Sequence, residues 1–155
     1  MSIPTVARLV PKIFVPGLLG LALFFTGAAC GDGDTDSTAQ ANLGREIYQQ
    51  NCAACHGVRG EGQPNWQVKR PDGSYPAPPH DTTGHTWHHS DGLLFRIVKD
   101  GGASLNIPNF KSGMPAFGQQ LQDEEVRTVI NHLKTFWEPE QRERQSQASG
   151  QDPFP

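Results

Sequence analysis

The stretch Cys52-Ala53-Ala54-Cys55-His56 decides how the rest of the chain is interpreted. Its Cys-x-x-Cys-His form is the attachment signature of c-type haem. Residues three apart share one face of a helical turn, so the thiols of Cys52 and Cys55 can both reach the edge of one porphyrin. The next imidazole can then turn toward the iron. The motif therefore predicts a covalently bound haem with His56 as a ligand of the metal.

Three other uses of a Cys-x-x-Cys pair remain open at this point. A zinc site needs four ligands, and the chain offers no second cysteine pair, only histidines at spacings unlike those of a zinc finger. A thioredoxin-type redox pair is expected within a βαβ unit, whereas the flanks here suggest helix and Gly/Pro-rich loop. A disulfide would leave the following histidine unexplained. Haem attachment accounts for all three side chains.

The first 29 residues have the features of an export signal. Arg8 and Lys12 precede an almost wholly apolar stretch, which ends in small residues. Cys30 is the odd cysteine of the chain, and Gly27-Ala28-Ala29-Cys30 resembles a bacterial lipobox, although the family pattern prefers an aliphatic residue at its first position. We predict cleavage, with lipidation of Cys30 as a membrane tether. The alternative is cleavage nearby that leaves an incidental thiol.

Composition divides the remaining chain into three parts. Residues 30–41 have hardly an apolar side chain, which predicts a flexible linker. Residues 42–137 contain the periodic apolar segments and form one small domain, whose core a haem would complete. Residues 138–155 are mostly Gln, Arg, Glu, Ser and Pro, which predicts a charged and mostly disordered tail.

Apolar periodicity predicts an all-α domain of three to four helices. The first helix runs from an N-cap at Asn42 to about residue 54, and the second begins at Ser90 or Asp91 and ends at Gly101-Gly102. A short β-hairpin is predicted over residues 66–76, because Pro-Asp-Gly is a turn signal. The last helix has apolar residues at helical spacing, namely Leu121, Val126, Val129, Ile130, Leu133 and Trp137.

Four of the six histidines fall within residues 80–89. Imidazoles are common ligands of transition metals, so one interpretation is a copper site, or a histidine that competes for the haem iron. The interpretation we favour is that these side chains hydrogen-bond loop carbonyls or a haem propionate, with nearby aspartates as partners. The four are His80, His85, His88 and His89.

Met114 lies between Gly113 and Pro115 in a loop, and it is the only methionine besides the initiator. A thioether in an irregular segment is poorly placed to fill a core, so we predict that Met114 is the second axial ligand. Packing alone remains an alternative, because methionine is an ordinary gap-filler. With a histidine in its place, the iron would have two imidazole ligands and a lower potential.

The motif at 52–56, the Gly-Met-Pro motif at 113–115 and a C-terminal amphipathic helix together resemble the small class I cytochromes c. Over residues 42–137 the resemblance implies a small cytochrome c fold around one covalent haem c, with His56 and Met114 as axial ligands. It also implies that Gly44 and Tyr48 meet the last helix, and that the carbonyl of Pro78 or Pro79 orients the ring of His56.

The net charge of the chain indicates which kinds of partner it can bind. Without Arg8 and Lys12 the chain has 11 basic and 16 acidic residues, a net charge of about −5, which argues against nucleic acid and favours basic patches on a partner. We predict a protein that is not an enzyme but a one-electron carrier between a redox protein donor and acceptor, in the periplasm or at the outer face of the cytoplasmic membrane. Two alternatives are an electron-entry subunit of a larger respiratory or dehydrogenase complex, and a five-coordinate haem protein with gas-binding or peroxidatic chemistry.

Overall fold

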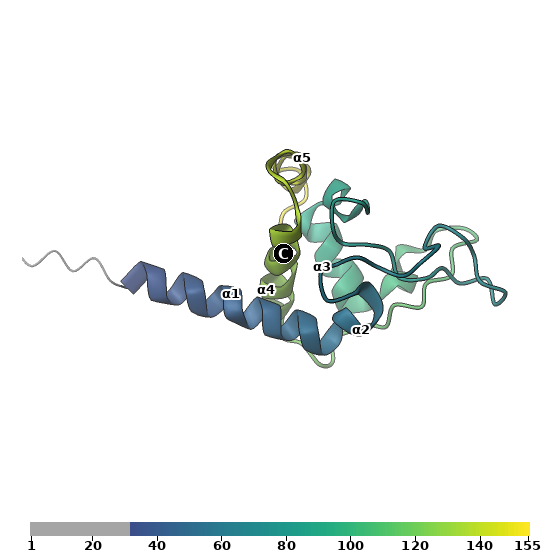
Figure 1. Cartoon of the computed structure of the whole chain (residues 1–155), viewed down its shortest axis with the longest axis horizontal. Helices are drawn as coiled ribbons and strands as arrows, with labels where there is room; N and C mark the ends of the chain where they lie inside the picture. Colours follow the sequence, from purple (N-terminus) through teal and green to yellow (C-terminus); the bar gives the residue numbers. More distant parts are fainter. Residues whose placement is uncertain (1–31) are drawn as a thin grey trace, which may run out of the picture. The chain divides into compact units, whose positions relative to one another are not determined.

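The computed structural model describes residues 32–155, and it describes side chains from residue 35 onward. The predicted signal and Cys30 lie outside the described residues. Within them the chain is helical and no strand is formed (Figure 1). No helix of this part is long and apolar enough to cross a membrane. The elements are α1 Asp32–Asn51, α2 Ala53–His56, η1 Thr86–His88, α3 Asp91–Asp100, η2 Gly102–Leu105, α4 Asp123–Leu133, η3 Lys134–Phe136 and α5 Pro139–Ser149.

The crossing of α1 and α4 is the frame of the domain (Figure 1). Gly44 lies at the contact, where a Cβ atom would come 2.8 Å from the carbonyl oxygen of Thr128. Tyr48 is fully buried one turn later, with its ring 5.5 Å from that of His132 and 5.3 Å from that of Phe136. The expectation that Gly44 and Tyr48 meet the last helix is therefore confirmed.

The apolar core is built mainly by α1, α3 and α4. The predicted second helix is confirmed as α3, and Ser90 caps it, because its Oγ accepts the backbone N–H of Leu93 at 3.1 Å. The helix that the sequence predicts as the last of the domain is confirmed as α4, and α5 follows it. The buried apolar residues are Ile47, Tyr48, Leu94, Phe95, Phe117, Leu121, Val126, Val129, Ile130, Leu133 and Trp137.

The predicted flexible linker is wrong for residues 32–41, which form the first half of α1. Asn42 is therefore inside a helix and is not an N-cap. Once the α1–α4 contact has nucleated the helix, each further residue adds a backbone hydrogen bond at low cost. Gln40 also ties this half to α4, since its Nε2 donates to Thr128 Oγ1 at 2.8 Å. Neither the extension of the helix from the α1–α4 contact nor the Gln40–Thr128 hydrogen bond can be predicted from composition alone.

The predicted disordered tail is also wrong, because residues 139–149 form α5. Pro139 is at the start of this helix, where its missing N–H costs nothing. Glu138 and Gln141 complete a capping box. Gln145 is buried, and its Nε2 donates to Asp91 Oδ1 at 2.7 Å. The tail thus packs through polar contacts that hydrophobic periodicity cannot detect.

The predicted β-hairpin is wrong within the described chain. A turn does form, since the N–H of Arg70 donates to the carbonyl of Ser74 at 2.8 Å, but the two flanks make no ladder. Instead Ser74 forms an isolated parallel bridge with Lys111, and the N–H of Tyr75 donates to the carbonyl of Lys111. The Pro-Asp-Gly signal identified the turn correctly, but the partner of the flanking segment is a distant loop.

Candidate haem site

The two cysteines sit on one continuous helical turn at the end of α1. The N–H of Cys52 donates to the carbonyl of Tyr48 at 2.9 Å, and the N–H groups of Cys55 and His56 donate back to the carbonyl of Cys52 at 3.1 and 2.9 Å. Both thiols are free, Cys52 half-buried and Cys55 exposed, so this pair does not form the disulfide that its spacing left open. Burial, reinforced by the charge of Cys55, raises the pKa of the Cys52 thiol to about 11.

His56 is only 6 % exposed, and its ring is held by a backbone carbonyl. Its Nδ1 lies 2.8 Å from the oxygen of Pro78, and an imidazole nitrogen facing a carbonyl must be the one that carries hydrogen. The Nε2 atom therefore has its lone pair available for a metal. Burial lowers the pKa of His56, which favours the neutral form that a metal requires. The carbonyl implied by the resemblance is thus that of Pro78.

His80 supports this ring, a role that the sequence did not indicate. Its imidazole stacks on that of His56 with centroids 4.0 Å apart and planes 21° apart. Its Nδ1 lies 2.9 Å from Thr86 Oγ1, and its carbonyl accepts the Nε1–H of Trp137 at 2.7 Å. Burial, and to a lesser extent His56 and His85, lower the pKa of His80 well below its usual value. The Pro-Pro pair and the clustered histidines indicated that this segment approaches the site, but neither indicated the stacking of His80 on His56.

The other three clustered histidines contact aromatic rings near the site. His85 stacks on Trp66 with centroids 5.5 Å apart, and its ring meets that of His89 edge-on at 5.2 Å. His88 stacks on Trp87 at 3.7 Å. Among residues 32–155 no three His, Cys, Asp or Glu side chains are grouped so that they could hold a metal ion. The arrangement gives no support to a copper site.

Met114 reaches the core from a loop laid against the end of α3. Its carbonyl accepts the N–H of Gly102 at 3.2 Å, and its own N–H donates to Ser112 Oγ at 3.1 Å. The side chain is half-buried against the apolar core. A Cβ at Gly101 would press on the backbone of residues 114–116, so the loop and the helix end fit closely.

These residues fit a covalent haem. Two free thiols lie one helical turn apart, the histidine that follows them has one nitrogen satisfied and one available, and a thioether lies against the same core. Thioether bonds need reduced thiols, and iron needs a neutral imidazole. An all-α domain built around this donor set is a small c-type cytochrome.

Comparison with known proteins agrees with that class. The family model described as "Cytochrome C oxidase, cbb3-type, subunit III" matches residues 39–133, which is more than half of the chain. The chain belongs to this family and carries covalently bound haem c. Cytochrome c-551 of Bacillus subtilis (strain 168) is 37% identical over 67 residues, which cover 37% of this chain and 60% of that protein. The chain thus spans less than two thirds of that relative, and no solved structure matches.

Proposed function

We propose that the protein is an exported one-electron carrier whose haem is bonded to Cys52 and Cys55 and ligated by His56 and Met114. The observation that carries the proposal is the buried ring of His56, directly after two free thiols, with its Nδ1 fixed by the Pro78 carbonyl. The haem supplies reversible one-electron chemistry at iron.

The chain's own residues set the conditions for that chemistry. The Pro78 carbonyl accepts the Nδ1 hydrogen, which fixes the tautomer of His56 and makes its other nitrogen a stronger donor. A haem held by the Met114 thioether and the His56 imidazole would have a higher potential than one held by two imidazoles. A haem held by both His56 and Met114 would offer no open position on the iron to a substrate or gas.

Location follows from the part of the chain before residue 32. The signal and Cys30 favour export, with lipidation at Cys30 holding the domain at the outer face of the cytoplasmic membrane. Membrane tethering is tested by intact mass of the purified protein, which shows a lipidated Cys30 as the first residue if the proposal holds.

A second candidate is supported by the family description, which names a subunit of an oxidase. On that basis the chain would be the electron-entry subunit of a larger complex rather than a free shuttle. Native gel analysis of gently solubilised membranes separates the two. A free carrier migrates alone, whereas a subunit comigrates with a partner at fixed stoichiometry.

The ligand assignment is tested by a redox titration with optical spectra. The wild type should titrate as a single one-electron couple and show the weak far-red band of sulfur-ligated ferric haem. Met114→Leu should lose the band, and its potential should fall by a sizeable part of the roughly 0.8 V that axial ligands span. Ile107→Leu, an exposed change in the same loop region, is the control and should match the wild type.

The five-coordinate alternative predicts the opposite behaviour. A wild-type protein that binds carbon monoxide rapidly when reduced and lacks the far-red band would contradict Met114 as a ligand. A colourless protein would contradict the whole proposal.

A further inference from the structure

Two loops far apart in sequence join into one surface, which we call the tip surface and define as residues 63–76 and 106–111. Besides the bridge between Ser74 and Lys111, the Nζ of Lys69 donates to the carbonyl of Asn109 at 3.0 Å. The ring of Tyr75 stacks on that of Phe110 with centroids 5.7 Å apart. The loops therefore form one unit, seen at the right of Figure 1.

The tip surface exposes apolar side chains. The described chain has five large apolar residues with more than a third of their surface exposed, and three of them lie here. Val68 is 62 % exposed, Ile107 51 % and Phe110 37 %. Exposed apolar side chains that gather on one part of a surface are a feature of interaction sites.

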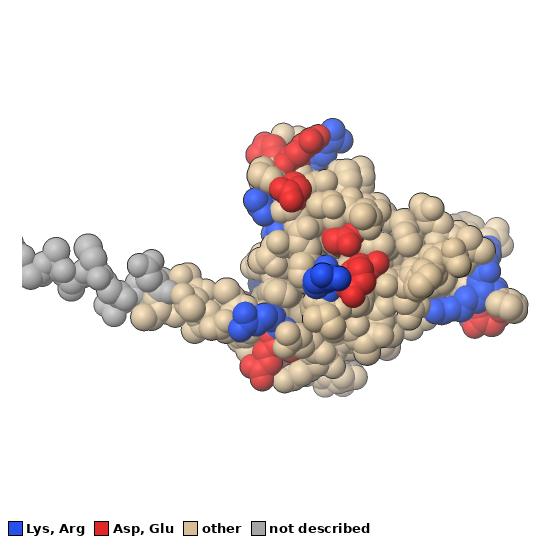
Figure 2. Space-filling view, in the orientation of Figure 1, with Lys and Arg blue, Asp and Glu red and all other residues tan. Residues whose placement is uncertain are grey.

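The same surface is the basic end of an acidic protein. It carries Lys69, Arg70 and Lys111 against one acid, Asp72, and Figure 2 shows the blue side chains gathered at this end with little red. The rest of residues 30–155 holds eight basic and fifteen acidic side chains. An acidic partner is therefore repelled by most of the molecule and attracted here, which orients the encounter.

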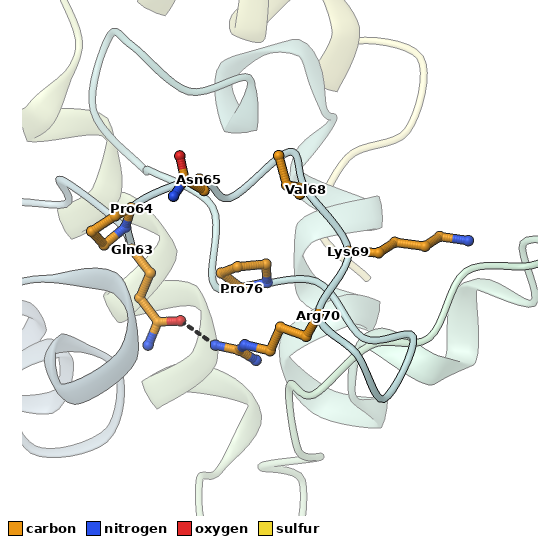
Figure 3. A pocket seen from close by; sticks show the side chains of 7 residues that line it. All are labelled: Gln63, Pro64, Asn65, Val68, Lys69, Arg70 and Pro76. Carbon is orange, nitrogen blue, oxygen red and sulfur yellow. Dashed lines mark hydrogen bonds between the residues drawn. The ribbon is translucent and has the colours of Figure 1, made fainter.

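Beside Arg70 lies a shallow open hollow of about 530 Å³. Figure 3 shows its walls, in which Arg70 reaches back to bond Gln63 Oε1 at 2.6 Å. Val68 stands on its rim and Pro76 on its opposite side. The hollow offers a partner an apolar contact with positive charge beside it.

The charges of the tip surface are held in place. Lys69 is bonded to Asn109 and Arg70 to Gln63, as described above. The Nζ of Lys111 donates to the carbonyl of Asp72 at 3.0 Å. Fixed cations suit fixed carboxylates on a folded protein. A membrane surface is the weaker candidate, since recognition of anionic lipid usually takes four to eight clustered cations and only three are present.

Both loops connect directly to the proposed iron ligands. The ends of loop 63–76 are closed beside His56, whose carbonyl accepts the N–H of Gly62 at 2.7 Å and whose Nδ1 is bound by Pro78. The second loop leads within three residues to Met114. A partner on the tip surface is thus seated on the segments that hold the haem site.

We propose that the tip surface docks a redox protein partner whose contact face is acidic around an apolar centre. This rests on the proposed electron-carrier function and identifies the chemistry of one partner. It reverses, for this surface, the expectation from net charge that the partner face is basic.

The test measures how fast the reduced, haem-loaded full chain is oxidised by respiring membranes of its source organism, as a second-order rate constant against ionic strength. Lys69→Glu with Arg70→Glu should lower the constant at least tenfold at low salt, and the difference should shrink at high salt. Arg45→Glu with Arg144→Glu makes the same charge change at exposed sites on α1 and α5 and should stay within about threefold. Val68→Ser with Ile107→Ser should slow the reaction severalfold at every salt concentration.

Three results would overturn the proposal. One is an unchanged rate in the Lys69 and Arg70 variant, and another is an equal loss in the Arg45 and Arg144 control. The third is binding of the wild type, but not of the variant, to protein-free phosphatidylserine vesicles, which would assign the surface to a membrane. If the wild type titrates as a reversible couple but one of these three results is obtained, the proposed docking surface is wrong and the proposed carrier function is not affected. If the membranes do not oxidise the reduced wild type at all, both the docking surface and the proposed carrier function are contradicted.

Discussion

The α1–α4 crossing and the loop that follows the haem motif are built by different rules. At the crossing, apolar residues repeat with helical spacing, and Gly44 lets two helix backbones approach. In the loop no repeat exists, and the chain is held by backbone bonds, such as His80 N–H to the Gly60 carbonyl at 2.7 Å and Gln63 N–H to the Ala77 carbonyl at 2.9 Å. Side-chain periodicity therefore specifies the frame, while glycine and proline geometry specifies the site.

The loop should be the more sensitive of the two to one added methyl group. Gly62 has φ +69°, and a Cβ there would lie 2.5 Å from the backbone nitrogen of Pro79, beside the carbonyl that orients His56. Gly62→Ala should cost about 3 kcal/mol of unfolding free energy, since left-handed strain and overpacking add. It should also reduce haem loading. Denaturant titration and the haem-to-protein absorbance ratio measure the two effects.

Gly73→Ala is the matched control in the same segment. Gly73 has φ +82°, but a Cβ placed on it would have no other atom within 4 Å, so only the backbone strain of roughly 1 kcal/mol should appear. Equal losses for Gly62→Ala and Gly73→Ala would mean that the approach of Pro79 is unimportant.

An added methyl group at the α1–α4 crossing should cost less unfolding free energy, because the higher helix propensity of alanine offsets part of the clash. Gly44→Ala brings a Cβ to 2.8 Å from the Thr128 carbonyl oxygen, a backbone atom that moves only with α4. Overpacking of about 3 kcal/mol, less about 1 kcal/mol of gained helix propensity, leaves a net cost of about 2 kcal/mol in denaturant titration. Gly150→Ala, where a Cβ meets only ordinary contacts, should be neutral or stabilising. A Gly44→Ala variant as stable as the wild type would contradict the close approach of α1 and α4.

This contrast explains which parts of the fold could be predicted from the sequence. The helices α3 and α4 follow from periodic apolar positions, and the structure has them. The contact of Gly44 and Tyr48 with α4 was implied by the resemblance to class I cytochromes c, and it is also present. The order of α5 could not be foreseen, because Gln145 and Ser149 hold it to Asp91 through polar contacts. The hairpin prediction failed because a turn signal does not name the partner of its flanks.

The same reasoning applies to the candidate site. The chemistry of Cys52, Cys55 and His56 is local in sequence, so a motif predicts it. The stacking of His80 on His56 is not local, since loop closure at Pro78 brings the two rings together. The four clustered histidines look like one metal site in the sequence, but His80 stacks on His56, His85 on Trp66 and His88 on Trp87.

The ordering of α5 can be tested by one buried amide. Gln145→Ala removes donors to Asp91 and Ser149 and should cost about 1.5 kcal/mol of unfolding free energy, as expected for a buried hydrogen bond to a charged group. Gln147→Ala changes an exposed glutamine on the same helix and should be within about 0.5 kcal/mol of the wild type. Identical stabilities would indicate that α5 contributes nothing to the fold.

The smallest effect concerns the contact between the C-terminal segment and α3. Hydrogen bonds from Arg96 and then Ser90 lower the pKa of Asp152 from 3.8 to about 2. A lowered pKa stabilises the fold above pH 3.8, and this stabilisation is lost as the pH falls toward 2. Thermal melts of the wild type should therefore decline more steeply between pH 4 and pH 2 than those of Asp152→Asn. Parallel declines would contradict the ion pair.

The central claim is that the turn at 52–56 carries the haem on both of its thiols. The direct measurement is mass spectrometry of the tryptic peptide between Arg45 and Arg59, taken from protein exported with haem-attachment machinery. We predict that this peptide carries the mass of one haem and that no thiol in it reacts with an alkylating reagent. A peptide of unmodified mass, with two alkylatable cysteines, would contradict the account.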